Sequence, residues 1–286
     1  MTSADPHSTQ VGTWWKTLAE ERSPVDLKTD QPHSARMYDY YLGGKDHFPA
    51  DREAAERTLA VFPNARIAAQ ANRAFMIRTT RYLAAQVGIR QFLDIGTGIP
   101  TSPNLHEAAQ GIASDARVVY ADNDPIVLTH ARALLTSTPA GRTAYLNADL
   151  HNPESILDAP ELRATLDLTQ PVALSLIATI HFFPDSDDPH GILRRLLQAL
   201  PSGSHLTLTH ATADYDEGME RVAAAYRAGG IPAQQRGRTE VARFFDGLDL
   251  LDPGLQIVHR WRPDDDTPND LTDAQVSFYG AVGRKP

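Results

Sequence analysis

The chain has 286 residues, a net charge of −9 and no cysteine, and 42% of its residues are hydrophobic. The lack of cysteine excludes disulfides, zinc–thiolate sites and a cysteine nucleophile, and the acidic charge argues against a nucleic-acid partner, whose phosphates need a basic surface. No stretch is apolar and long enough to span a membrane, and the N-terminus lacks the apolar core of a signal peptide. We therefore expect a cytoplasmic globular protein.

Residues 1–32 are polar and irregular, apart from Trp14 and Trp15, which could dock on the folded body. We predict a flexible tail here, because the ends of a chain are poorly ordered unless they are tied down. Residues 33–286 carry regular patterns throughout and are expected to form a single domain.

Residues 33–88 predict three helices, over residues 35–42, 51–61 and 64–87. Gly43 and Gly44 end the first of them. This helical cap could cover one edge of a sheet or close over a ligand. Tyr38, Tyr40 and Tyr41 could stack on a base or cover a cation, although aromatic residues on a helix also commonly pack in a core.

The first predicted strand covers residues 92–95 and runs into the motif Asp94-Ile-Gly96-Thr97-Gly98. Two glycines at this spacing allow a tight turn and close approach of a ligand. A dinucleotide site would have a third glycine, and Asp94 would repel a pyrophosphate but suits a cationic ligand such as S-adenosylmethionine. An ordinary glycine turn after a strand explains the motif equally well.

The second predicted strand covers residues 116–121 and ends at Asp122. An acidic residue here can accept hydrogen bonds from both ribose hydroxyls of an adenosine, in NAD as well as in S-adenosylmethionine. Asp124 is expected to cap the helix that Pro125 begins.

Several segments together resemble the S-adenosylmethionine-dependent methyltransferase family long catalogued as a domain of unknown function, which belongs to the Rossmann-like class I methyltransferases. The resemblance covers nearly all of the chain after about residue 30, and these motifs carry it: SARMYDYYLGGKD at 34–46, DREA at 51–54, ANRAF at 71–75, FLDIGTGIPT at 92–101, NLHE at 104–107 and YADNDP at 120–125. It implies the fold and the cofactor, S-adenosyl-L-methionine, but no acceptor. It also implies that Tyr38, Gly43 and Arg73 close the pocket, with Arg73 contacting the carboxylate of the methionine part.

The third predicted strand covers residues 143–148 and ends at Asp149 and Leu150. From the residues alone, Asp149 is expected to cap the helix at 153–157. The resemblance implies instead that Asp149 accepts a hydrogen bond from the adenine amino group and that Leu150 packs on the ring.

The fourth predicted strand, residues 171–177, is continuously apolar, as expected of a central parallel strand. Ligands of open α/β sheets bind beyond the carboxyl ends of the strands, so His181 should lie near the reacting group. We predict that His181 is a general base, although it could also serve only the structure of the loop. His210, at the end of a fifth strand over residues 204–209, is a second candidate.

The last part of the chain predicts helices at 188–200, 214–228 and 240–245, and strands at 255–261 and 275–282. Two final strands without a helix between them are typical of the antiparallel end strand of methyltransferases. The predicted fold is therefore α/β and Rossmann-like, with a seven-stranded, mostly parallel sheet, an antiparallel end strand and the helical cap.

We predict an enzyme that moves a methyl group from S-adenosylmethionine to an oxygen or nitrogen of a small-molecule acceptor, without a metal. Asp94, Gly96, Thr97 and Gly98 would hold the methionine part, and Asp122 and Asn123 the ribose side. The alternatives are a non-catalytic protein that binds S-adenosylmethionine as a sensor or partner and, with less support, an NAD-dependent oxidoreductase. The acceptor and the oligomeric state do not follow from the sequence.

Overall fold

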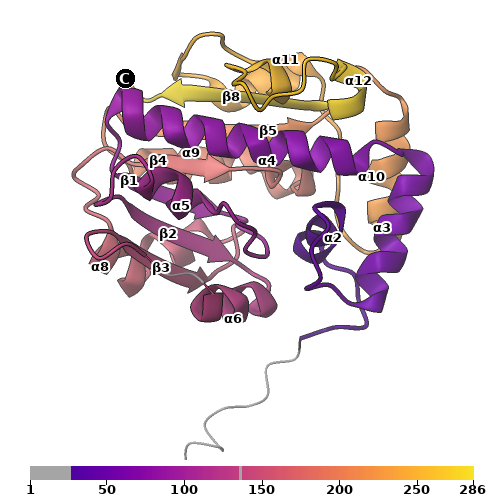
Figure 1. Ribbon diagram of the computed structural model, residues 1–286, viewed down its shortest axis with the longest axis horizontal. Helices are drawn as coiled ribbons and strands as arrows, with labels where there is room; N and C mark the ends of the chain where they lie inside the picture. Colours follow the sequence, from indigo (N-terminus) through magenta and orange to yellow (C-terminus); the bar gives the residue numbers. More distant parts are fainter. Residues whose placement is uncertain (1–26, 135–136) are drawn as a thin grey trace, which may run out of the picture.

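The structure is a computed structural model that describes residues 27–134 and 137–286. Trp14, Trp15 and most of the predicted N-terminal tail lie outside the described residues. The described chain forms a twisted sheet with helices packed against it, and the view in Figure 1 looks onto the long helix α4, Ala65–Tyr82, where it crosses the sheet.

Eight strands make up the sheet in the described ranges, in the order β3-β2-β1-β4-β5-β8-β6, with β7 also paired to β8. β1 to β5 run parallel, whereas β8 is antiparallel to β5, β6 and β7. This arrangement confirms the predicted fold class. The strands are β1 Gln91–Ile95, β2 Arg117–Asp122, β3 Arg142–Asn147, β4 Ala173–Leu176, β5 His205–Ala211, β6 Asp249–Leu250, β7 Gln256–Ile257 and β8 Phe278–Arg284.

The central strands are buried along their whole length, as expected of strands that are covered on both faces. Every residue of β1, β4 and β5 is buried. Asp94 lies near the end of β1 and is one of the few ionisable residues in this layer. The register pairs Asp94 with Tyr120 on β2 and with Ser175 on β4.

Helices occupy the predicted segments before and between the strands. They are α2 Ser34–Tyr41, α3 Pro49–Val61, α4, α5 Leu105–Gln110, α6 Pro125–Leu134, α7 Pro153–Leu157, α8 Pro160–Thr165, α9 Pro189–Gln198, α10 Gly218–Ala228, α11 Arg238–Ala242 and α12 Asp273–Val276. A π-helical turn, Leu83–Val87, extends α4. In Figure 1, α2, α3 and α10 stand together at one end of the sheet, beside the end of α4.

The predicted strand at 255–261 is wrong beyond Ile257, where the chain leaves the sheet as a 3-10 turn, Val258–Arg260. Trp261 is fully buried and meets the rings of Phe75 and Tyr82 on α4 edge-on, at 5.6 and 5.8 Å between ring centroids. Arg78 of α4 also donates to the Val258 carbonyl at 2.7 Å. These contacts with α4 replace further strand pairing.

The last predicted strand begins later than expected, and the prediction missed β6. Residues 273–276 form α12, because Thr272 and Gln275 cap its first turn reciprocally. β6 has two residues, too few for a visible alternating pattern, and pairs with the end of β8.

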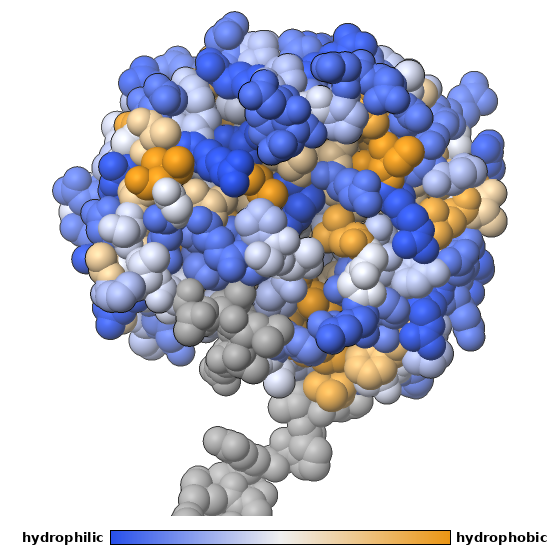
Figure 2. All heavy atoms as spheres, viewed as in Figure 1, coloured by the Kyte–Doolittle hydropathy of each residue, from blue (hydrophilic) through white to orange (hydrophobic). Residues whose placement is uncertain are grey.

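The face of the molecule in Figure 2 is coloured by hydropathy. Figure 2 shows a largely hydrophilic face with small, separate hydrophobic areas. Throughout the part of the chain that the structure describes, no helix has the length and apolar content needed to cross a membrane.

Candidate active site

A cavity of about 370 Å³ opens where β1, β2, β3 and β4 end, and α2, α4 and the end of α10 form its other walls. It lies at the carboxyl edge of the parallel strands, where open α/β sheets bind their ligands. Of the residues predicted from the sequence, these line it: Tyr38, Arg73, Asp94, Gly96, Thr97, Gly98, Asp122, Asn123, Asp149, Leu150 and His181.

The turn after β1 needs its glycines for two different reasons. Gly96 and Gly98 both have a left-handed backbone, with φ of +73° and +68°, which other L-residues adopt at a cost. A Cβ at Gly96 would also lie 2.4 Å from Oγ1 of Thr179, whereas a Cβ at Gly98 would meet nothing closer than 4.0 Å. The turn therefore has a tight position followed by an open one.

Gly96→Ala is expected to lower the free energy of unfolding by more than Gly98→Ala, which serves as its matched control. Both variants place alanine in left-handed backbone, which costs about 1–2 kcal/mol of stability. Only Gly96→Ala also forces the Thr179 side chain to move. Urea denaturation of both proteins measures the difference. Equal losses would contradict the close approach of Thr179.

Two buried carboxylates face this turn. Asp94 accepts a hydrogen bond from the Thr97 hydroxyl at 3.4 Å, and burial raises its pKa to about 6. Asp122 accepts hydrogen bonds from the backbone N–H groups of Gly98 and Asp124, at 2.8 and 2.9 Å, and burial raises its pKa as well. Burial destabilises the ionised forms of both carboxylates, and a nearby cation would stabilise those forms. The cavity therefore favours a positively charged ligand.

Arg73 brings a positive charge to the same region. Its Nη2 donates to the carbonyls of Thr101 and Pro103, while its Nε is buried and has no hydrogen-bond partner among the described residues. The guanidinium is thus held at the glycine turn with one donor unused. A ligand carboxylate would satisfy that donor with a charge-assisted hydrogen bond.

Asp149 lies at the rim of the cavity and does not cap α7, whose N-cap is Asn152. Its Oδ1 contacts Nδ1 of His151 at 2.7 Å and accepts from the His151 backbone at 2.9 Å. Although partial burial acts to raise the pKa of Asp149, the hydrogen bonds from His151 lower it overall. The His151 ring also packs on Phe183, at 4.4 Å between centroids. Sequence reasoning found Asp149 and Leu150 but missed His151 and Phe183.

Tyr38 belongs to the cavity wall, but Gly43 does not. The Tyr38 hydroxyl donates to the Ala69 carbonyl and accepts from Asn72, both at 3.0 Å. Gly43 is exposed, has φ of +81° and ends α2. The expectation that Gly43 closes the pocket is therefore corrected: the Gly-Gly pair is a helix end, packed at Gly44 against the Asp39 carboxylate.

The two histidine candidates differ in their surroundings. His181 lines the cavity, and burial, helped by the charge of Arg236, lowers its pKa to about 3, so its ring is neutral at physiological pH. His210 is fully buried and does not line the cavity; its Nδ1 contacts the Ala211 carbonyl at 2.7 Å and its Nε2 contacts Arg236 at 3.0 Å. Both ring nitrogens are occupied, so His210 is a structural residue here rather than a base.

Residues 20–286 match the protein family described as S-adenosyl methyltransferase. The chain belongs to this family. A solved DUF574 family protein from Streptomyces avermitilis is 54% identical, with a TM-score of 0.89, and the match covers 91% of this chain and 100% of that one. A protein from Thermobifida fusca, named as a candidate methyltransferase, is 38% identical with a TM-score of 0.83, over 92% of this chain and 98% of that one.

More distant structures share the fold alone. An O-methyltransferase family protein from Burkholderia thailandensis is 12% identical, with a TM-score of 0.51, and the match covers 95% of this methyltransferase and 68% of that chain. No match was found among curated proteins. Family membership confirms S-adenosylmethionine as the cofactor and the predicted family resemblance.

The charges in the methyltransferase cavity fit S-adenosylmethionine, which carries an amino group, a sulfonium and a carboxylate. Asp94 and Asp122 are buried carboxylates without a cationic partner of their own at hydrogen-bond distance in the described chain. Arg73 has the free donor that a carboxylate needs. A phosphate-bearing cofactor would meet these carboxylates with like charge.

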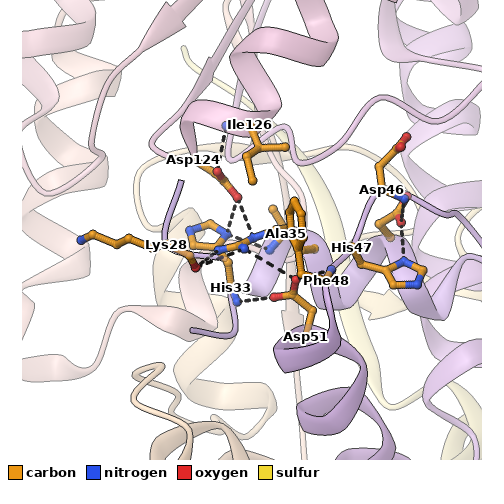
Figure 3. Close-up of polar contacts among 11 residues, drawn as sticks. Lys28, His33, Ala35, Asp46, His47, Phe48, Asp51, Asp124 and Ile126 are labelled. Carbon is orange, nitrogen blue, oxygen red and sulfur yellow. Dashed lines mark hydrogen bonds and ion pairs between the residues drawn. The ribbon is translucent and has the colours of Figure 1, made fainter. Parts of the chain in front are cut away.

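An ion-pair network, which the sequence did not reveal, attaches the helical cap of the methyltransferase to its core (Figure 3). Asp124 caps α6 through the Ile126 backbone at 2.9 Å, as predicted. Its other oxygen lies 3.1 Å from Nε of Arg36 and 3.3 Å from Nδ1 of His33. Arg36 also lies 3.6 Å from Asp51 of α3. The network holds residues 33–38, part of the cavity wall, against the end of β2.

Proposed function

We propose that this methyltransferase transfers the methyl group to an oxygen or nitrogen nucleophile of a small-molecule acceptor. The observation that carries the proposal is a single cavity that joins the carboxylates at the glycine turn to His181 and a wall of aromatic residues. The bound cofactor supplies a methyl group that is already activated by a positively charged sulfur. The protein then has to orient the acceptor toward that methyl group.

We propose these roles for the residues that line the cavity. Asp94, with the turn at Gly96, Thr97 and Gly98, binds the amino group of the methionine part, and Arg73 binds its carboxylate. In the same cavity, Asp122 and Asn123 bind the ribose hydroxyls, and Asp149 and Leu150 contact the adenine. Tyr38 closes the pocket from the side of α2.

His181 remains our candidate for the residue that touches the nucleophile. A ring with a pKa of about 3 holds a proton weakly, and a general base works best when its pKa is near the operating pH. We therefore propose that neutral His181 orients the acceptor by accepting a hydrogen bond from its O–H or N–H group. The proton itself leaves for solvent.

Calorimetry with S-adenosylmethionine and with NAD tests the choice of cofactor, and a screen of acceptors with labelled S-adenosylmethionine tests catalysis. We expect binding of the first ligand only, and label in at least one small molecule. Tight NAD binding without S-adenosylmethionine binding would refute the proposal. Cofactor binding with no methylated product across a broad screen would favour the non-catalytic sensor.

Asp122→Ala is expected to weaken cofactor binding by roughly 1–3 kcal/mol, because a buried carboxylate that accepts the ribose hydroxyls is removed. Asp115→Ala, which removes an exposed carboxylate paired with Arg90, is the matched control and should leave affinity unchanged. Calorimetry measures both. If the Asp122 variant, shown folded by circular dichroism, binds as tightly as the wild type, Asp122 does not contact the ribose.

A further inference from the structure

The charged side chains of the cavity are confined to one part of its wall. Its carboxylates lie at the ends of β1, β2 and β3, and Arg73 lies next to them at the glycine turn. The lining residues from segments 177–183 and 226–232, together with Phe278, include no Asp, Glu, Lys or Arg. We call this part the uncharged wall; its larger side chains are Ile177, His181, Phe182, Phe183, Tyr226, Ile231 and Phe278.

A second, smaller cavity of about 60 Å³ lies behind the uncharged wall. Tyr41, His181, Phe182, Tyr226 and Phe278 line both cavities, so these side chains lie between them. The residues that line the inner cavity also include no Asp, Glu, Lys or Arg. The apolar surroundings thus continue from the cofactor cavity toward α3 and α10.

Two buried polar atoms in this region lack hydrogen-bond partners in the described part of the chain, namely Nδ1 of His181 and Oε1 of Gln235. Gln235 lines the inner cavity, and its Nε2 donates to the Met219 carbonyl at 3.1 Å, which leaves its oxygen as an acceptor. An unsatisfied buried polar group costs about 1–3 kcal/mol. Such groups are satisfied when a ligand brings a hydrogen-bond donor.

The aromatic rings favour a flat ligand. Phe182 and Tyr226 lie 5.5 Å apart between centroids, and His181 lies 5.7 Å from Phe278 and 4.2 Å from Phe182. Aromatic rings pack on one another at such separations in offset or edge-to-face geometry. A charged acceptor would instead lose its hydration here without gaining a partner.

We propose that the uncharged wall and the inner cavity behind it bind the methyl acceptor, and that this acceptor is a neutral aromatic molecule with a hydroxyl group that donates to His181. The inference rests on the proposed function and adds the substrate class to it. Aliphatic amines, amino acids and nucleotides are excluded because each carries a charge at neutral pH that this wall cannot pair.

The first test measures binding of three probes with one ring system to the protein saturated with S-adenosylhomocysteine. We expect naphthol to bind at least about tenfold more tightly than its methyl ether, which lacks the donor, and than naphthoate, which is charged. Equal or tighter binding of naphthoate overturns the proposal, as does the absence of naphthol binding. Failure to bind S-adenosylhomocysteine would instead count against the proposed function, so the two failures are distinguishable.

A matched pair of variants locates the site. Ile231→Asp places a carboxylate on the uncharged wall at a half-buried position, and Ile112→Asp makes the same change at a residue that is 48% exposed elsewhere. Only the first should weaken naphthol binding, by about tenfold or more, while both keep their affinity for S-adenosylhomocysteine. Naphthol binding unchanged in Ile231→Asp places the acceptor elsewhere.

His181→Phe tests the hydroxyl partner independently of Ile231. Phenylalanine keeps a ring in the wall but removes the accepting nitrogen, so the preference for naphthol over its methyl ether should shrink toward none. Comparing the two ligands in wild type and variant forms a cycle that isolates the hydrogen bond from packing. An unchanged preference overturns the role of His181.

Discussion

Asp94→Asn is expected to weaken S-adenosylmethionine binding by roughly ten- to hundredfold at about pH 8, because it removes the carboxylate proposed to bind the ligand's amino group. Asparagine has almost the same shape, so the loss reports the charge rather than the packing. Calorimetry on the variant and the wild type measures the change.

The pH dependence of the wild type supplies a second signature of the same residue. Burial raises the pKa of Asp94 to about 6, so the group is mostly protonated below that pH and ionised above it. Wild-type affinity should therefore rise as the pH increases through about 6, and part of this rise should be missing in Asp94→Asn. The pKa of Asp122 is raised too. Asp122 is present in both proteins, so the part of the pH dependence that it causes remains in Asp94→Asn.

Stability separates this loss of binding from unfolding. A carboxyl whose pKa is raised on folding makes the native state bind more protons than the unfolded chain. Asp94 therefore lowers stability as the pH rises from 3.8 to about 6, and the full loss persists above that pH. Asp94→Asn should consequently be no less stable than the wild type at about pH 8. The control Asp158→Asn, at a side chain that is 69% exposed, should change neither property. Unaltered cofactor affinity in Asp94→Asn would refute the proposal that Asp94 binds the amino group of the ligand.

Arg36→Met is expected to lower the free energy of unfolding by about 3–5 kcal/mol, since it removes the guanidinium that pairs with both buried carboxylates, Asp51 and Asp124. The side chains of Arg36, Asp51 and Asp124 are 3%, 0% and 1% exposed, so water does not screen the repulsion that remains. Chemical denaturation measures the loss. Because the network holds the wall formed by residues 33–38, cofactor affinity should fall as well.

Arg163→Met is the matched control for this variant. Arg163 pairs with Asp158 on the surface, with side chains that are 63% and 69% exposed, and such pairs contribute about 0–1 kcal/mol. If Arg36→Met cost no more than Arg163→Met, the network would not be what attaches the cap to the core.

The local sequence correctly predicted the strand β1 and the tight turn at Gly96 and Gly98 that follows it. The strand, Asp94, Gly96 and Gly98 follow one another directly in the sequence. The geometry of this segment depends on backbone sterics that act within a few residues. The same holds for Asp122 at the end of β2 and for the cap at Asp124. Because the parallel strands end at one edge of the sheet, residues directly after them came together in one cavity.

Predictions failed where a local sequence pattern was compatible with two different structural roles. The Gly-Gly pair after α2 ends a helix, and nothing in its spacing showed that Gly43 would face solvent. His181 follows β4 and His210 lies near the end of β5, but only His181 lines the cavity. Residues 258–261 looked like a strand, yet they pack against α4 and do not continue β7.

The amino-acid sequence on its own determined the α/β class and the residues of the glycine turn, because short-range backbone geometry and strand order encode them. The S-adenosylmethionine family followed from the resemblance of its motifs and was confirmed by the family match. Only the tertiary structure decided that Arg36 joins Asp51 to Asp124, that His210 contacts Arg236 and that one wall of the cavity is uncharged. Those features depend on contacts between segments far apart in the chain, and their energies come from burial, which no local pattern reports.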